Sequence, residues 1–119
     1  MNILLATGDA DAQSVLDAEI SSLGHEVVWV TDGLAACDEI LASTPAIVFL
    51  DRQLEIFDGL EVCRRLREDP EVPDHLPVFL FTDEDIDVRI LEKTGVTAIF
   101  PKTHSASEIT ALLSGYAAL

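Results

Sequence analysis

Ala46-Ile47-Val48-Phe49-Leu50-Asp51 is the stretch that decides the fold of this 119-residue chain. Five consecutive apolar residues lead directly into a carboxylate. A strand with one wet face alternates apolar and polar side chains, whereas a strand covered on both faces is apolar throughout. The stretch therefore predicts a strand inside a parallel sheet, with an aspartate at its carboxyl end.

Four similar short runs accompany this one along the chain. They occupy residues 3–6, 27–30, 78–81 and 98–100, and segments of helical length with one apolar face separate them. Such regular alternation predicts βα units whose right-handed crossovers cover both faces of one sheet. We expect a single α/β domain over residues 1–119, with a doubly wound, five-stranded parallel sheet in the flavodoxin-like order 2-1-3-4-5.

The helical segments are expected to turn their apolar stripes toward the sheet. The first ends at Gly24, a typical C-terminal glycine, and the last begins after Ser105, a typical N-cap. The third carries Arg64, Arg65 and Arg67 on its solvent side. The predicted inward-facing residues, from the first helix to the fifth, are Ala12, Val15, Leu16, Ile20 and Leu23; Leu34, Cys37 and Leu41; Val62, Cys63 and Leu66; Ile86, Ile90 and Leu91; and Ile109, Leu112, Leu113 and Tyr116.

The composition limits the partners of the protein. Apolar residues make up 49% of the chain, which is enough for a core and excludes intrinsic disorder. The 22 acidic and 7 basic side chains give a net charge of −15, which repels nucleic acid and anionic membrane surfaces. No run approaches the roughly 20 apolar residues of a membrane span, and the first residues do not resemble a signal peptide, so we expect a cytoplasmic protein. Cys37 and Cys63 lack a metal-binding spacing and are expected to be buried thiols.

The carboxyl ends of the predicted strands are where an open parallel sheet binds ligands. Asp51 follows the third strand, Thr82 the fourth and Lys102 the fifth, so a carboxylate, a hydroxyl and an ammonium should meet at one edge. The carboxylate can act as a nucleophile and form an aspartyl phosphate, while the other two groups stabilise charge on the phosphoryl oxygens. Each residue alone is more often a turn or capping residue, but the combination predicts phosphoryl chemistry.

The motifs around these residues resemble the receiver domains of response regulators in two-component systems. DGLEV at residues 58–62 begins seven residues after Asp51, LPVFLFT at residues 76–82 ends at Thr82, and a glycine precedes Lys102 by seven residues. The resemblance covers nearly the whole chain. It implies a phosphoacceptor signalling domain rather than an enzyme, in which a histidine kinase or phosphotransfer protein phosphorylates Asp51, Thr82 hydrogen-bonds the phosphoryl group and Lys102 pairs with it. It also implies a downstream protein target, and a homodimer through the face of the fourth helix, fifth strand and fifth helix.

The residues after the first strand depart from this family. Its members usually carry two adjacent acids there, which hold Mg²⁺, and the corresponding residues here are Thr7 and Gly8. By the resemblance, the remaining ligands for Mg²⁺ are Asp51, the carbonyl of Gln53 and, at most, Asp9. Because magnesium is usually held by carboxylates together with phosphate and water, we expect weak binding and slow phosphorylation.

Other departures concern the loops around the predicted site. Ile99 replaces the usual aromatic residue of the fifth strand, and Pro101 precedes Lys102 where a proline more often follows the lysine. An acidic run, residues 83–85, directly follows Thr82. We expect this run to be the solvated start of a helix, since the helix dipole favours acids there; beside a phosphoryl group it would be repulsive.

Four functions are open at this point. Asp51, Thr82 and Lys102 favour a phosphorylatable switch, whereas the lost acidic pair favours a phosphorylation-independent pseudo-receiver that acts as a protein-binding module. Residues 7–9 only faintly resemble the phosphate loop of a small flavin protein. A phosphatase with an aspartate nucleophile usually has a second Asp two positions later, where Gln53 stands. The three histidines are scattered and predict no shared metal site.

Overall fold

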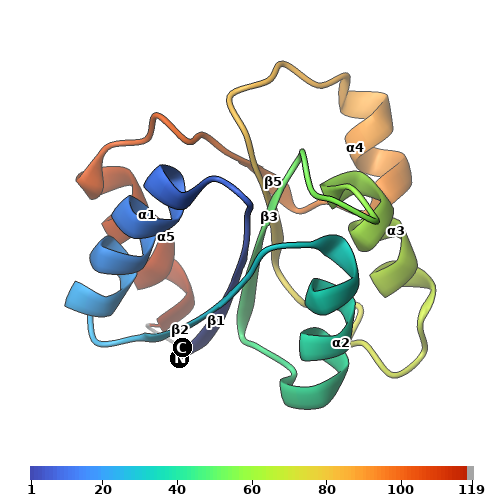
Figure 1. The fold of residues 1–119 in the computed structure, drawn as a ribbon, viewed down its shortest axis with the longest axis horizontal. Helices are drawn as coiled ribbons and strands as arrows, with labels where there is room; N and C mark the ends of the chain where they lie inside the picture. The colour runs from blue at the N-terminus through green and yellow to red at the C-terminus, as the bar shows by residue number, and fades with distance from the viewer. Residues whose placement is uncertain (118–119) are drawn as a thin grey trace.

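The computed structural model describes residues 1–117 and shows one sheet between two layers of helices (Figure 1). All strand pairs are parallel and the order is β2-β1-β3-β4-β5, which confirms the predicted doubly wound sheet. The strands are β1 (Asn2–Ala6), β2 (Glu26–Val30), β3 (Ile47–Asp51), β4 (Val78–Phe81) and β5 (Ala98–Phe100). The helices are α1 (Ala10–Ser22), α2 (Gly33–Ser43), α3 (Gly59–Glu68), α4 (Val88–Thr94) and α5 (Ala106–Ala117).

Each central strand supplies two cores, because successive side chains point to opposite faces of the sheet. In β1, Leu5 packs on the side of α1 and α5, and Leu4 packs on the side of α2 and α3. In β3, Phe49 and Leu50 divide in the same way. This double coverage is the reason why residues 47–50 are apolar at every position.

Aspartates begin four of the five helices. Asp9, Asp32, Asp58 and Asp87 are the N-caps of α1 to α4, and each carboxylate accepts a hydrogen bond from a backbone N–H of the first turn. In α5, the predicted cap Ser105 accepts one from the N–H of Glu108 at 3.3 Å. Because every βα loop lies at the carboxyl edge of the sheet, these caps concentrate acidic groups there.

The predicted inward face of α2 was wrong for its two leucines, although Cys37 packs against the core. Leu34 and Leu41 are 45% and 46% exposed, whereas Ala36 and Ile40 are fully buried. Gly33 explains the rotation, because a Cβ at this position would collide with the backbone carbonyl of Phe57. The N-terminus of α2 thus lies close against the backbone of Phe57, and Ala36 and Ile40, rather than the two leucines, face the sheet.

Two further predictions about helix faces need correction. In α1, Leu16 and Ile20 are buried as predicted, but Val15 is 56% exposed. Arg67 of α3 does not face solvent: its guanidinium donates hydrogen bonds to the carbonyls of Gly95, Asp74 and Leu76 at 3.0, 3.1 and 2.7 Å. It therefore joins α3 to the loop before β4 and to the C-terminus of α4.

The acidic run after Thr82 is not the start of a helix. Residues 83–85 lie in an irregular loop, α4 begins only at Val88, and Ile86 precedes it. None of the seven residues of α4 is buried. The predicted apolar faces of α3 and α5 hold, since Val62, Cys63, Leu66, Ile109 and Leu113 are all buried.

Cys63 is buried, Cys37 is half-buried, and both thiols are free. Among the helices that the structure describes, none has the length and apolar character to cross a membrane.

Candidate phosphoacceptor site

Asp51 is the last residue of β3 and lies at the carboxyl edge of the sheet, where its side chain is almost entirely buried. Thr7 follows β1, the strand that pairs with β3 on one side, and Thr82 follows β4, the strand on the other side. Lys102 arrives from the loop after β5. The strand order thus brings together the three predicted residues, Asp51, Thr82 and Lys102, which line one cavity of about 350 Å³.

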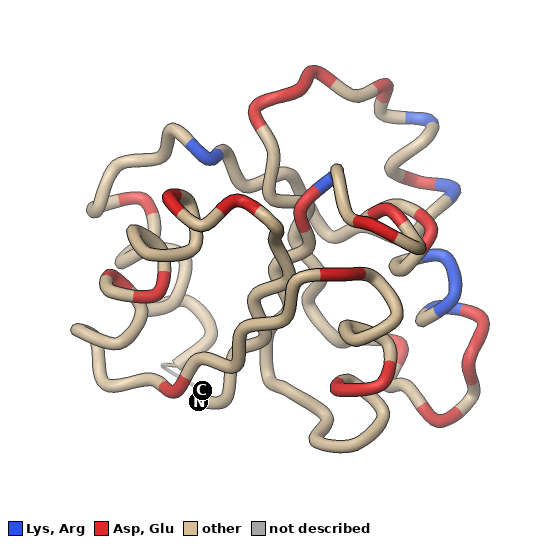
Figure 2. Tube along the Cα trace, viewed as in Figure 1, with Lys and Arg blue, Asp and Glu red and all other residues tan. Residues whose placement is uncertain are grey.

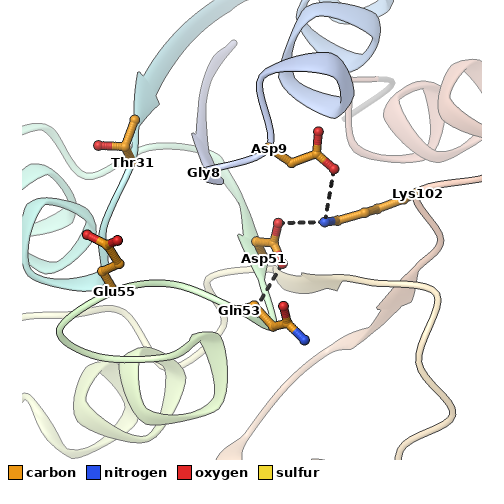
Figure 3. A pocket seen from close by; sticks show the side chains of 7 residues that line it. All are labelled: Gly8, Asp9, Thr31, Asp51, Gln53, Glu55 and Lys102. Carbon is orange, nitrogen blue, oxygen red and sulfur yellow. Dashed lines mark hydrogen bonds and ion pairs between the residues drawn. The ribbon is translucent and has the colours of Figure 1, made fainter.

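The carboxylate of Asp51 is held by three donors. The Thr7 hydroxyl donates to Oδ2 at 2.7 Å, and the Lys102 ammonium lies 2.7 Å from the same oxygen. The backbone N–H of Gln53 donates to Oδ1 at 3.0 Å (Figure 3). Oδ1 consequently has the larger free acceptor capacity of the two oxygens.

Lys102 is a charged group enclosed by acids. Its Nζ also lies 3.5 Å from Oδ2 of Asp9, so one ammonium spans two carboxylates (Figure 3). Partial burial opposes the charged form, but the hydrogen bond and charge of Asp51, with the charge of Asp9, outweigh it and raise the pKa of Lys102. The ring of Phe81 lies 5.9 Å from the ammonium and adds a cation–π contact.

The loop that carries Lys102 is fixed on both sides. The backbone N–H and the hydroxyl of Thr103 donate to Asp83 at 3.1 and 3.0 Å. The buried ring of His104 is hydrogen-bonded to the carbonyl of Pro101 at 2.8 Å and to Glu19 of α1 at 2.6 Å. The displaced proline therefore does not prevent the lysine from reaching Asp51.

Thr82 is buried near Asp51, but its side chain is turned toward its own loop. Its Oγ1 accepts a hydrogen bond from the N–H of Glu84 at 3.1 Å. The role of Thr82 as a donor to a phosphoryl group remains a prediction. The hydroxyl hydrogen is free to serve that purpose, because the bond to Glu84 uses only an oxygen lone pair.

Thr7 is the site residue that sequence reasoning missed. It was read only as the loss of an acid, yet it is fully buried, donates to Asp51 and accepts from the N–H of Asp9 at 3.0 Å. Its own carbonyl accepts from the indole N–H of Trp29 at 2.9 Å. The available signal was the pairing of the first and third strands, which places the residues after them side by side.

Carboxylates surround the site. Glu84 lies 3.7 Å from Arg52, and both Asp83 and Glu84 line the same cavity as Asp51. Figure 2 shows acidic residues along the loops at this edge, and the sequence contains no Lys or Arg before Arg52. Residues 83–85 are exposed to solvent as expected, but Asp83 and Glu84 also line the cavity of Asp51.

The predicted magnesium ligands share a second cavity, of about 540 Å³. Asp9, Asp51 and Gln53 line it together with Gly8, Thr31 and Glu55 (Figure 3). As they stand, these donors do not fit a divalent cation. Oδ2 of Asp51 already accepts from two groups, and Asp9 uses one oxygen to cap α1 at Ala12 and the other to pair with Lys102. Nor do residues 1–117 contain a group of three His, Cys, Asp or Glu side chains arranged for a metal ion.

Asp9 has a structural role that accounts for its position. The N–H of Ala12, and then Lys102, lower the pKa of its carboxyl group. Asp9 is therefore a charged N-cap that also contacts the site, and its role as a magnesium ligand stays a prediction.

Comparison with known proteins agrees with this geometry. Residues 3–114 match the family model described as the response regulator receiver domain. The chain belongs to this family. It is 32% identical over 113 residues to the response regulator MprA of Mycobacterium avium, a match that covers 93% of this chain and 48% of MprA. The receiver domain thus spans about half the length of the curated relatives that it matches, which are response regulators of two-component signalling.

Solved structures of receiver domains superpose on nearly the whole chain. A putative response regulator from Chloroflexus aurantiacus has a TM-score of 0.88 at 22% identity, with 99% of this chain and 98% of that chain covered. The receiver domain of the sensor histidine kinase PA1611 from Pseudomonas aeruginosa, with magnesium in its active-site cleft, has a TM-score of 0.87 at 22% identity, with the same coverage. The BeF3-activated receiver domain of Klebsiella pneumoniae RstA has a TM-score of 0.85 at 26% identity and covers 98% of this chain and 97% of that chain.

Proposed function

We propose that Asp51 accepts a phosphoryl group from a histidine kinase or phosphotransfer protein, slowly and with weakened dependence on Mg²⁺. The observation that carries the proposal is the ammonium of Lys102, 2.7 Å from the Asp51 carboxylate, with Thr82 in the same cavity. A carboxylate paired with an ammonium at the carboxyl edge of a parallel sheet suits the formation of an aspartyl phosphate, because ligands bind at this edge and a carboxylate can act as a nucleophile.

The geometry divides the roles between the two oxygens of Asp51. Oδ2 is occupied by Thr7 and Lys102, so Oδ1 is the oxygen that attacks phosphorus. The new bond joins Oδ1 to phosphorus, and the bond from phosphorus to the donor's nitrogen or oxygen breaks, with the electron pair leaving on the donor. Lys102 then offsets part of the charge on the phosphoryl oxygens, and the Thr82 hydroxyl donates to one of them.

The acidic surroundings slow this reaction. Asp83, Glu84 and Glu55 line the two cavities that flank Asp51 and repel an incoming phosphate dianion. Among residues 1–117, Lys102 is the only cationic side chain in direct contact with Asp51. The expected outcome is transfer that is measurable but slower than in a receiver domain with additional positive charge at the site.

Intact mass after treatment with a small phosphodonor tests the proposal. The wild-type protein should gain the mass of one phosphoryl group, the Asp51→Ala variant should gain none, and Lys102→Ala should gain it more slowly. Parallel reactions with and without Mg²⁺ should differ little. No gain in the wild type, under conditions that label an ordinary receiver domain, would refute phosphoacceptance.

A phosphorylation-independent pseudo-receiver is the second candidate. It is favoured by the full set of donors on Asp51, since Thr7, Lys102 and Gln53 already satisfy the carboxylate without any ligand. In that case the domain acts through protein contacts alone, and the absence of labelling in the mass experiment is its expected result.

The output surface that we propose is the face of α4, β5 and α5. Val88 and Ile90 of α4 are 62% and 44% exposed, which suits contact with a downstream protein or a second copy of the domain. The net charge of −15 makes a direct contact with nucleic acid or an anionic membrane unfavourable and is consistent with a cytoplasmic setting.

A further inference from the structure

The hydroxyl of Thr7 occupies an acceptor position on Asp51 that a cation would need. Thr7 is fully buried, and its Oγ1 lies 2.7 Å from Oδ2 of Asp51. Oγ1 of Thr7 also accepts a hydrogen bond from the N–H of Asp9, and its own hydrogen is donated to Asp51. Two backbone contacts fix the residue, namely its N–H to the carbonyl of Val30 at 3.0 Å and its carbonyl to the indole of Trp29 at 2.9 Å. This arrangement makes Thr7 a rigid donor.

The ammonium of Lys102 completes the substitution. It bridges two carboxylates, that of Asp51 at 2.7 Å and that of Asp9 at 3.5 Å. A divalent cation would have to displace this ammonium from both carboxylates, or share them with it at the cost of like-charge repulsion. The site thus carries its own monovalent cation, covalently attached to the chain.

Gly8 leaves the neighbouring position without a ligand. It lines the same cavity as Asp9 and Asp51, and it is exposed. A Cβ built at Gly8 would meet only the carbonyl oxygen of Thr31, at 3.9 Å, which is an ordinary van der Waals distance. A carboxylate could therefore be added at this position without repacking the core.

We infer that Thr7 and Lys102 hold Asp51 in place of a divalent cation, and that residues 7 and 8 exclude Mg²⁺ from this site. The inference rests on the proposed function only in treating the Asp51 cavity as the functional site. It concerns cation binding at equilibrium, so it is tested without any phosphoryl transfer, and the two proposals can fail separately.

The chain contains a built-in reporter for the test. Trp29 is the only tryptophan in the sequence, and its indole N–H donates to the carbonyl of Thr7. The hydroxyl of the same threonine donates to Asp51, so Thr7 connects the indole to the site. Titration of the wild-type protein with MgCl₂, at ionic strength balanced with NaCl, should give no saturable change in fluorescence and no rise in melting temperature in the low millimolar range.

The Gly8→Asp variant should acquire a saturable response to Mg²⁺, because magnesium affinity depends on the number of carboxylate ligands. Its apparent dissociation constant should lie at least about tenfold below the highest Mg²⁺ concentration at which the wild type gives no response. Gly8→Asn has nearly the same size without the charge and should behave as the wild type. Thr7→Asp should show the same gain. If its buried acid prevents folding without metal, Gly8→Asp alone decides the test, since residue 8 is exposed.

Either of two results would overturn the inference. The first is a saturable response of the wild type that is as tight as that of Gly8→Asp and is lost in Asp51→Ala. The second is a folded Gly8→Asp protein that responds no more tightly than Gly8→Asn. Absence of phosphoryl labelling in the mass experiment would count against phosphoacceptance but leave these expectations unchanged.

Discussion

Helices α3 and α4 lie side by side on the same face of the sheet (Figure 1), and they are held there in different ways. The apolar side of α3 is buried through Val62, Cys63 and Leu66, and its exposed arginines are paired with Glu61 and Glu68. The seven residues of α4 include no buried side chain. A helix of this length is marginal by itself, so α4 depends on its neighbours, chiefly on the link from Arg67 to Gly95 at its C-terminus.

The difference in packing assigns different parts of the proposed signalling path to the two helices: α3 is the firmly packed element beside Asp51, and α4 is the loosely packed element of the output face. The N-terminus of α3 lies beside Asp51, since a Cβ at Gly59 would collide with the backbone carbonyl of Asp51. In contrast, α4 follows the acidic loop after Thr82 and exposes Val88 and Ile90. Segments with few buried contacts open most readily, so α4 is the element that a change at the site would shift at the lowest energetic cost.

Truncation of one apolar residue in each helix should give the largest contrast. Leu66→Ala is expected to lower the free energy of unfolding by about 3 kcal/mol, because it removes a buried side chain and leaves a cavity. Ile90→Ala, in the exposed face of α4, should change it by no more than about 0.5 kcal/mol. Urea denaturation of both variants measures the contrast. Equal losses would show that α4 is packed as firmly as α3.

The thiol of Cys63 should make the α3 core sensitive to alkali. Burial raises the pKa of Cys63 from 9.0 to about 11, so the folded state favours the neutral thiol. Above the pKa of the unfolded chain, the unfolded state binds fewer protons than the folded state, and stability falls as pH rises. The loss should reach about 2 to 3 kcal/mol between pH values of about 9 and 11.

Unfolding in urea across this range checks the effect, with Cys63→Ala as the variant that lacks it. Other groups also titrate at high pH, so the relevant quantity is the difference in slope between the variant and the wild type. Cys37→Ala, at the half-buried thiol of α2, is the matched control and should retain most of the slope. A Cys63→Ala protein with the full wild-type slope would contradict the assignment.

Loss of the Arg67 guanidinium should have the next largest effect on the free energy of unfolding. Arg67→Ala removes three charge-assisted hydrogen bonds to backbone carbonyls and is expected to cost about 2 kcal/mol. Arg64 lies on the same helix but pairs only with exposed glutamates, so Arg64→Ala should cost at most about 0.5 kcal/mol. Melting temperatures and urea midpoints of the two variants test this. Similar losses for both would mean that Arg67 does not hold α4 and β4 together.

Much of this architecture could be predicted from the sequence, because it depends on patterns that are local or follow from strand order. The apolar runs predicted the strands, and the order 2-1-3-4-5 brought Asp51, Thr82 and Lys102 to one edge. The rotation of α2 could not be predicted, since it depends on how closely Gly33 approaches Phe57. The ranking of side chains by hydrophobicity selected Leu34 and Leu41, which are partly exposed.

The strand order could have placed Thr7 beside Asp51, but not the hydrogen bond between them. The Thr7 hydroxyl bonds to a carboxylate 44 residues away, and the sequence records only that an acid is missing. The predicted start of α4 was misplaced because residues 83–85 are acidic, as Asp87 is, and acidic residues are favoured at a helix N-terminus. Of these residues, only Asp87 accepts a hydrogen bond from the first turn of α4. Side chains that act across elements, as Arg67 and Thr7 do, are therefore what the structure adds to the sequence.

Removal of the α4 cap should have the smallest effect on global stability and the most local one. Asp87→Ala deletes the acceptor for the N–H of Arg89 and is expected to cost α4 itself about 0.5 to 1 kcal/mol. Because no α4 side chain is buried, α4 can open while the rest of the domain stays folded. Hydrogen exchange should therefore quicken at residues 88–94 with little change at residues 59–68, and the urea midpoint should hardly move.

Asp58→Ala, the matched change at α3, should instead lower the midpoint, since α3 opens only with the core and Asp58 also pairs with Arg52 at 2.7 Å. If Asp87→Ala lowered the midpoint as much as Asp58→Ala, α4 would be part of the same cooperative unit as α3, and its proposed role as the mobile output element would fail.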